Sequence, residues 1–277
     1  MTITASQVKE LREATNVGMM ECKRALTEAC GDMDAAIKLL RERGMAIADK
    51  KAGREAKEGL IAADISQDGK LGVIVEVNCE TDFVARNEVF QAFVAGLVEK
   101  ARAAAGNLAE THKDELTAKV AEIGENLVIR RNDRFEVDGT GTVASYIHLG
   151  GKVGVLLEVG CEKKETLDEP DFKDVVKDIT LHIAASDPRF LVRADVPPDT
   201  LAAEREIFAK QAEGKQENII DKIVNGKMEK FYEDKCLLDQ PFVKDGDQTV
   251  SQLLAAHGKV MGDTLTVRRF LRYQIGA

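Results

Sequence analysis

The sequence contains no tryptophan, only five prolines and four histidines, and aromatic residues make up just 5% of its 277 positions. The histidines are scattered, and neither an HExxH nor a GxSxG motif is present. The phosphate-binding pattern GxxxxGK[ST] is missing as well. Because no catalytic constellation can be assembled from the remaining polar residues, we expect a protein that is not an enzyme and that holds no cofactor and no metal.

Cysteine is scarce and irregularly placed. The five residues form an odd number with no CxxC spacing, which predicts neither a disulfide framework nor a zinc site, and we expect all of them to be buried free thiols. They are Cys22, Cys30, Cys79, Cys161 and Cys236.

Long apolar runs are absent too. The N-terminal residues lack the apolar core of a signal peptide, and the longest runs, near 73–77 and 153–157, are too short to cross a bilayer. These features predict a cytoplasmic protein with no membrane partner. The formal net charge is -9, which disfavours direct nucleic-acid binding because phosphate contacts require clustered Lys and Arg. The expected partner is therefore another protein.

The first 45 residues predict a head of three short helices. Thr4 and Gln7 have the spacing of a capping box and open the first helix. The second is expected over 19–29 and the third over 33–43, ending at Gly44. The charged stretch KKAGREAK, which follows shortly after, lacks an apolar face and is expected to be a solvated connector.

Beyond the connector the chain repeats itself. The segment 59–80 aligns without a gap with 141–162, and eleven of the twenty-two aligned positions are identical. Each copy contains two β-rich runs around a Gly-Lys turn, at Gly69-Lys70 and at Gly151-Lys152, which predicts a hairpin. An amphipathic helix follows in both copies, with its apolar stripe starting at Phe90 and Phe172.

A second alignment closes the repeated unit and reveals an insertion. The pattern GxxLxxRRxxR of 124–134 recurs at 262–272. The distance along the chain between these two segments is longer than the distance between 59–80 and 141–162. The second copy therefore carries an insertion, which lies between about 187 and 262. Within it, 200–213 and 216–232 are expected to form two antiparallel helices, because the second has a continuous apolar stripe and Gly214 lies between them.

These patterns predict an α+β protein in which the two copies pack together to cover their exposed sheet faces. The expected organisation is a helical head and connector (1–55), a first core subdomain (56–140), the first part of a second core subdomain (141–188), an inserted coiled-coil hairpin (189–236), and the second part of the second subdomain (237–277).

The candidate binding site lies where the two copies differ. After the shared Cys-Glu, the first copy continues with Thr81-Asp82-Phe83-Val84, and the second with Lys-Lys-Glu-Thr at 163–166. If the core of the unit required an aromatic residue here, the second copy would be expected to keep an apolar one. We therefore expect Phe83 to be a surface wedge for a partner, although packing into its own core is the alternative. Asp82 is the next candidate, and Thr81 and Val84 are expected to shape the loop.

The head offers a second candidate contact. Met19 and Met20 follow a glycine at the start of the second predicted helix. One is expected to face a partner, and the alternative is that one of them packs against the third helix.

Four segments resemble the elongation factor Ts family: VKELREATNVGMMECKRALTEACGD (8–32), VIVEVNCETDFVARNEVFQAF (73–93), IGENLVIRR (123–131) and QPFV (240–243). The resemblance implies a three-helix head similar to a UBA domain, two related core subdomains and a coiled-coil hairpin. It also implies that the protein promotes release of GDP from the translational GTPase elongation factor Tu, so that GTP can rebind.

The resemblance further implies specific contacts with the GTPase. Phe83 would enter an apolar pocket between two helices, and Asp82 would disturb the surroundings of the GTPase's Mg²⁺ and phosphates. Additional contacts are implied for six positions: Arg12, Met19, Met20, Ile123, Gly124 and His148. A passive adaptor that binds without altering nucleotide affinity is the alternative function. The sequence leaves open whether the coiled-coil hairpin supports a homodimer in a two-to-two complex.

Overall fold

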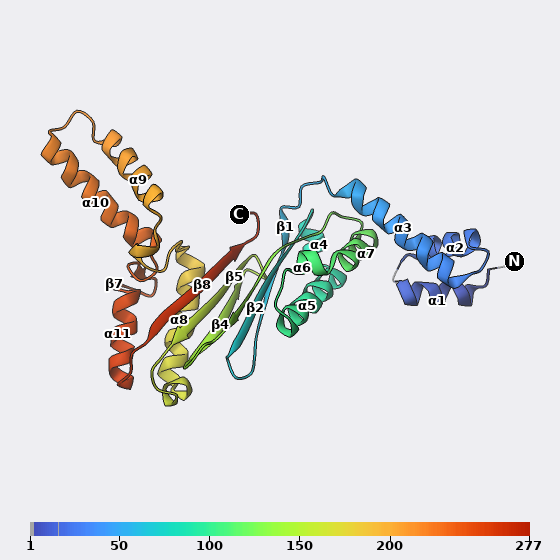
Figure 1. Ribbon diagram of the computed structural model, residues 1–277, viewed down its shortest axis with the longest axis horizontal. Coiled ribbons are helices and arrows are strands. Elements are labelled where there is room, and N and C mark those ends of the chain that lie inside the picture. Colours follow the sequence, from blue (N-terminus) through green and yellow to red (C-terminus); the bar gives the residue numbers. More distant parts are fainter. Residues whose placement is uncertain (1–2, 16) are drawn as a thin grey trace.

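The computed structural model describes residues 3–15 and 17–277. A helical head lies at one end of the molecule, two packed sheets form the middle, and a helical hairpin projects at the other end (Figure 1). The chain contains both helices and strands, and both three-stranded sheets are antiparallel. The expected α+β class is therefore confirmed.

The head consists of α1 (Ala5–Thr15), α2 (Met19–Glu28) and the first part of α3 (Met33–Lys51). The capping box forms as predicted: the Gln7 N–H donates to Thr4 Oγ1 (3.3 Å), and the Thr4 N–H donates to Gln7 Oε1 (3.0 Å). The three helices enclose their own small core, whose buried members are Val8, Leu11, Cys22, Ala25, Leu26, Ala36 and Leu40.

The prediction that the third helix ends at Gly44 is wrong, because α3 continues for another two turns to Lys51. Gly44 is buried, and a Cβ at this position would lie 3.5 Å from Cβ of Ala121 in α7 (Lys113–Ile123). Further along α3, Ala48 packs against the core of the first sheet. Tertiary packing therefore outweighs the weak helix propensity of glycine, and the non-helical connector starts only at Ala52.

Six long strands form two related sheets. The first has the order β1-β2-β3, and the second has the order β4-β5-β8. The strands are β1 (Glu58–Ile65), β2 (Leu71–Cys79), β3 (Val128–Glu136), β4 (Gly141–His148), β5 (Val153–Gly160) and β8 (Thr266–Gln274).

The strand register confirms the predicted repeat. Gly59 pairs with Asn78 in the first sheet, and the equivalent Gly141 pairs with Gly160 in the second. A register shift falls between Glu76 and Val77 where β2 meets β3, and it recurs at the equivalent place between β5 and β8. The two sheets are thus copies of one unit down to the position of an irregularity.

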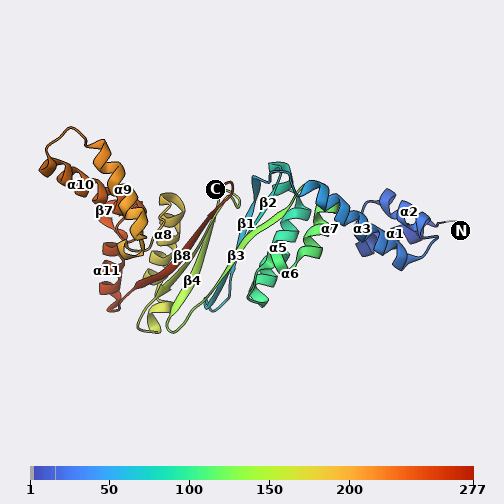
Figure 2. The ribbon, with the colours of Figure 1, turned by 45° about the horizontal axis from the view of Figure 1, so that its top comes forward.

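Each sheet is covered on its outer face by a long helix, α5 (Glu88–Ala103) or α8 (Pro170–Ser186), as Figure 2 shows. Short elements complete the two units: α4 (Asp82–Ala85) and α6 (Leu108–Thr111) in the first copy, and the 3₁₀ turns η1 (Glu165–Asp168) and η2 (Arg193–Asp195) in the second.

The inner faces of the sheets pack directly against each other. Their buried side chains form a shared cluster of Ile61, Ile74, Phe135, Val143, Leu156 and Tyr273. Glycine permits the close approach: a Cβ on Gly72 would lie 2.4 Å from Val143, and a Cβ on the equivalent Gly154 would lie 2.4 Å from Ile61. Because both glycines belong to the repeat, the contact is nearly symmetric, and the expectation that the copies cover each other is confirmed.

Hydrogen bonds join the two sheets in the same reciprocal way. The Ile61 N–H donates to the Gly151 carbonyl, and the Val143 N–H donates to the Gly69 carbonyl, both at 2.8 Å. The two Gly-Lys turns therefore hold β1 and β4, one edge strand of each sheet, against the other copy. This role goes beyond the turn function that the sequence predicts for them.

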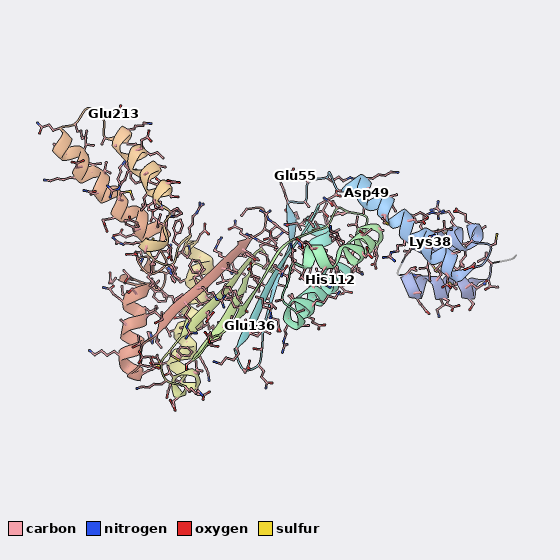
Figure 3. The ribbon with its side chains drawn as sticks, viewed as in Figure 1. Lys38, Asp49, Glu55, His112, Glu136 and Glu213 are labelled. Carbon is pink, nitrogen blue, oxygen red and sulfur yellow. The ribbon has the colours of Figure 1, made fainter. Side chains whose placement is uncertain are left out.

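The inserted residues include two antiparallel helices, α9 (Pro198–Gln211) and α10 (Glu217–Lys235), with bounds close to those predicted. The side chains of Val224 and Met228 in the predicted apolar stripe are buried. Glu213 lies at the tip of this helical hairpin, at the opposite end of the molecule from Lys38 in the head (Figure 3). Between this hairpin and β8 lie β6 (Pro241–Phe242), β7 (Asp245–Thr249) and α11 (Val250–Met261), and α11 ends at Gly262 as α7 ends at Gly124.

The fold bears on two further predictions, the burial of the cysteines and the lack of a membrane-spanning segment. Four of the cysteines are buried as expected, but Cys30 is exposed because it lies in the turn between α2 and α3 with a positive φ of 53°. Over 3–15 and 17–277, every helix is too short or too polar to span a membrane.

We expect Gly154→Ala to lower the free energy of unfolding by roughly 1–3 kcal/mol, since the new methyl group overpacks the interface between the sheets. Urea denaturation of the two proteins measures this difference. Gly96→Ala is the matched control: this glycine lies in α5, and nothing is within 4 Å of its added Cβ. The control should gain up to about 1 kcal/mol from helix propensity. A neutral Gly154→Ala would contradict the close packing.

Candidate protein-binding surface

The segment Thr81–Val84 begins two residues after the end of β2 and contains the start of α4. Thr81 is the N-cap residue of this helix, and its hydroxyl accepts a hydrogen bond from the Val84 N–H (3.3 Å). The predicted loop is therefore a single helical turn, which orients each of its side chains differently.

Phe83 points into solvent from this turn. Its exposed fraction is 82%, the highest among the large apolar side chains of the described residues. Val84 packs against the core of the first sheet and Ala85 is buried within it, so the same turn that anchors these two residues directs Phe83 outward. The alternative that Phe83 packs into its own core is wrong for this structure. A largely exposed phenylalanine on an anchored turn is typical of a side chain that inserts into a partner.

Asp82 lies beside Phe83 at the rim of a hollow of about 290 Å³. Its carboxylate forms an ion pair with Arg86 one turn later (3.1 Å), and both side chains are substantially exposed. The opposite wall of the hollow comes from the second copy and includes Leu149, Gly150 and Lys152. Leu149 is 70% exposed and has a positive φ of 49°, in the turn that follows β4.

His148 precedes this turn and is exposed. Its Nδ1 lies 2.9 Å from the hydroxyl of Tyr146, and the two rings are stacked. The hydrogen bond between Ile61 and Gly151 holds the turn against β1, and Lys152 forms an ion pair with Glu58 there. The sheet interface thus brings the 148–152 turn of the second copy beside α4 of the first.

The turn after α7 contacts the residues that immediately precede α4. Ile123 packs against the first core, Gly124 ends α7 with a φ of 84°, and Lys51 of α3 donates to the Gly124 carbonyl. The next residue, Glu125, accepts hydrogen bonds from the N–H groups of Glu80 (3.1 Å) and Thr81 (3.0 Å) and from the Thr81 hydroxyl (2.7 Å). Ile123 and Gly124 are therefore adjacent in space to Thr81–Val84.

Sequence reasoning missed Glu125, although the repeat contains a signal for it. The alignment of 124–134 with 262–272 matches Glu125 with Asp263, another carboxylate. Asp263 accepts the equivalent backbone hydrogen bonds, from the N–H groups of Glu162 (3.0 Å) and Lys163 (3.1 Å), and one from the Thr166 hydroxyl (2.5 Å). Both copies thus use a carboxylate to hold the end of the central strand, and we call this arrangement the carboxylate clamp.

The clamp in the second copy changes the acidity of its carboxyl group. Burial by itself would raise the pKa of Asp263, but the hydrogen bonds from the Thr166 hydroxyl and from three backbone N–H groups outweigh it and lower the pKa to about 2. In the first copy, the pKa of the neighbouring Glu80 is also lowered, mainly because its carboxylate accepts a hydrogen bond from the Asn126 N–H.

The head residues form a separate area. Arg12 is exposed near the end of α1, and Met19 and Met20 are exposed at the start of α2, at 43% and 68%. Neither methionine belongs to the core of the head. Figures 1 and 2 both show α1 and α2 at the far end of α3 from the sheets, and Figure 1 shows α4 on the side of the sheets. The predicted contact residues therefore fall into two areas, one around α4 and one on the head.

Comparisons with known proteins give one consistent result. A family model described as "Elongation factor TS" matches residues 80–277. Proteins named "Elongation factor Ts" from Trichlorobacter lovleyi and Nitratiruptor sp. are each 46% identical to the chain, covering 100% of it and 93% and 94% of their own lengths. A protein of the same name from Nitratidesulfovibrio vulgaris is 44% identical, over 100% of the chain and 96% of its own length.

The clamp of the second copy predicts a defined pH dependence of stability. Its folded-state pKa of about 2 lies below the ordinary 3.8, so the folded protein favours the ionised carboxylate. This stabilisation is complete above about pH 3.8 and is lost as pH falls toward about 2. We therefore expect Asp263→Asn to be less stable than the wild type at pH 7, with the difference shrinking through this window. Thermal unfolding at a series of pH values measures it.

Glu99→Gln is the control for this series, because Glu99 is an exposed carboxylate on α5. It should match the wild type at every pH. If the difference between wild type and Asp263→Asn were the same at pH 2 and pH 7, the clamp would not depend on ionisation.

Proposed function

Since the chain belongs to the elongation factor Ts family, we propose that it is a guanine nucleotide exchange factor for elongation factor Tu. It binds the GDP form of that GTPase and promotes release of GDP, so that GTP can rebind. The reaction requires no covalent step, in keeping with a protein that acts by binding.

The observation that carries the proposal is the exposure of Phe83 on an anchored turn. An isolated aromatic ring gains free energy by leaving water, and the partner pocket that fits it is apolar. Because Thr81 and Val84 are held by the protein's own framework, little backbone freedom is lost when the ring inserts. The proposed wedge is thus preorganised for binding.

Asp82 is proposed to act beside the wedge on the Mg²⁺ and phosphate site of the GTPase. Mg²⁺ usually keeps several waters and contacts the nucleotide through phosphate oxygens, so a small change in its surroundings weakens nucleotide binding. A carboxylate is a suitable group to compete for those waters. Arg86 is its ion-pair partner in the free protein, and this exposed pair can separate at low cost when the complex forms.

Exchange follows from reciprocal coupling. A factor that binds nucleotide-free GTPase more tightly than the GDP form weakens GDP binding by the same ratio. GTP can then displace the factor, because the coupling operates in both directions. The surface around α4 supplies the contacts that distinguish the two states.

The remaining predicted contacts belong to the same proposal. Ile123, Gly124 and His148 border α4 and extend the surface, whereas Arg12, Met19 and Met20 form a second contact on the UBA-like head. The length of α3 keeps these two areas apart, so they would bind different parts of the GTPase. The proposed subdomain boundaries lie at 55, after the head and connector, at 140, between the two core subdomains, and at 188 and 236, on either side of the inserted hairpin.

The helical hairpin is proposed as a coiled coil that serves protein association. Ile207 and Ile219 are exposed on it, at 47% and 41%, so its apolar stripe is not fully used within the chain. Pairing of two such hairpins would give the homodimer of a two-to-two complex.

We expect Phe83→Ala to slow the maximal rate of GDP release from elongation factor Tu by roughly 30-fold, the effect typical of losing a central aromatic anchor. Its free energy of unfolding should change by less than about 0.5 kcal/mol, because the ring makes few contacts in the free protein. Stopped-flow release of a fluorescent GDP analogue and urea denaturation measure the two quantities.

Val260→Ala is the matched control, since Val260 in α11 is also highly exposed, at 79%, but lies away from α4. Its exchange rate should equal that of the wild type. If the wild-type protein failed to accelerate release at saturating concentration, the exchange function would be refuted and the passive adaptor favoured.

A further inference from the structure

We infer that Glu125 is a positioning residue for the wedge: its carboxylate fixes the direction in which Phe83 leaves the protein. This inference rests on the proposed exchange function, because it concerns how the wedge is presented to the GTPase. Glu125 itself lies behind α4 and acts through the residues that it holds.

The hydrogen bonds of Glu125 define this role. Two consecutive backbone N–H groups, those of Glu80 and Thr81, donate to the same carboxylate oxygen at 3.1 and 3.0 Å. Because consecutive N–H groups in an extended strand point in opposite directions, their convergence on one oxygen requires the chain to turn at this point. The carboxylate thus ends β2 and sets the direction of the residues that follow.

Thr81 passes this constraint on to the wedge. Its hydroxyl donates to Glu125 Oε1 (2.7 Å) and accepts from the Val84 N–H (3.3 Å). One side chain therefore links the carboxylate to the first turn of α4, and Phe83 lies within that turn. An unbroken series of hydrogen bonds runs from Glu125 to the backbone that carries the aromatic ring.

Glu125 is itself held rigidly. The residue before it, Gly124, ends α7, and the residue after it, Asn126, is buried. The Asn126 N–H donates to Glu80 Oε1 (2.6 Å), and its amide group donates to the Arg54 carbonyl (2.7 Å) in the connector from the head. A carboxylate on such a fixed turn can orient a neighbouring segment, whereas one on a flexible loop could not.

The second copy has the same carboxylate clamp but no exposed phenylalanine beside it, so it can be compared with the first copy. There Asp263 receives its hydroxyl hydrogen bond from Thr166, a buried residue that corresponds to Val84 rather than to Thr81. The chain then forms the 3₁₀ turn Glu165–Asp168, which has no side-chain cap. In the first copy the threonine occupies the N-cap position instead, and an α-helical turn with Phe83 at its surface results. The position of one hydroxyl relative to the clamp thus distinguishes the wedge copy from the plain copy.

The first test is GDP release from elongation factor Tu, measured over a range of factor concentrations with wild type and Glu125→Gln. The amide keeps the shape of the side chain but loses the charge that strengthens all three hydrogen bonds. We expect the maximal rate to fall by about tenfold or more, because a small misplacement of a reacting or inserting group has a large effect on rate. The half-saturating concentration should change by less than about threefold, since the head and the other contacts still bind.

Glu125→Asp provides a rescue. The equivalent carboxylate in the second copy is an aspartate, and it reaches both backbone N–H groups there. The aspartate variant should therefore recover most of the rate that the glutamine variant loses. An equal loss in both variants would contradict the role assigned to the carboxylate.

Asp263→Asn is the matched control, because it weakens the same clamp in the copy without a wedge. It should lose stability but exchange nucleotide at the wild-type rate when assayed well below its melting temperature. If it slowed exchange as much as Glu125→Gln, the effect would be a general consequence of destabilisation and the inference would be overturned.

Hydrogen exchange of the free protein gives a second readout that is independent of the GTPase. In Glu125→Gln, the amides of residues 80–84 should exchange faster than in the wild type, while those of 162–166 should not change. Asp263→Asn should give the reverse pattern. Unchanged exchange at 80–84 in Glu125→Gln would also overturn the inference.

These outcomes are separable from failure of the proposed function. If wild type accelerates GDP release and Phe83→Ala does not, but Glu125→Gln behaves as wild type, the exchange function stands and the positioning role is refuted. If wild type itself fails to accelerate release, the exchange function is refuted, and with it the inference that depends on it.

Discussion

The reciprocal contact between the two sheets is the constraint on which the rest of this structure depends. Each sheet has one face under a helix and one face that only the other sheet can cover. Gly72 and Gly154 let the faces approach, and the two Gly-Lys turns close the edges of β1 and β4. The same contact places the 148–152 turn beside α4, so the shape of the candidate binding surface is a consequence of how the two copies pack.

Charged groups fix the alignment of this contact. Glu76 is fully buried and pairs with Arg131 (2.7 Å), and the equivalent Glu158 pairs with Arg269 (2.7 Å). Each arginine then stacks on an aromatic ring of the other copy: Arg131 on Tyr273 at 3.9 Å, and Arg269 on Phe135 at 4.1 Å. Buried ion pairs add little net stability, because desolvation offsets most of the attraction. Their value here is that each buried carboxylate orients an arginine whose stacking on the other copy would be lost if the sheets slipped.

On this nearly symmetric framework, the functional features are asymmetric. The wedge is present only in the first copy, the helical hairpin only in the second, and the head is attached through α3 to the first. The carboxylate clamp illustrates the principle: both copies retain it for stability, and the first copy combines it with an N-cap threonine and an exposed phenylalanine. The features that differ between the copies thus lie outside the shared interface, to which both copies contribute.

The sequence alone determined the features that depend on local pattern or on comparison of the chain with itself. These include the repeat and its register, most helix positions, the insertion, and the choice of Phe83 from the point where the copies differ. Tertiary structure alone decided the continuation of α3 through Gly44, which packing on Ala121 stabilises, the role of Glu125, and the position of Leu149 beside Asp82. The physical reason is the distance along the chain: helix capping and hydrophobic periodicity act over a few neighbouring residues, whereas these contacts join segments that are far apart in the sequence and meet only in the folded protein.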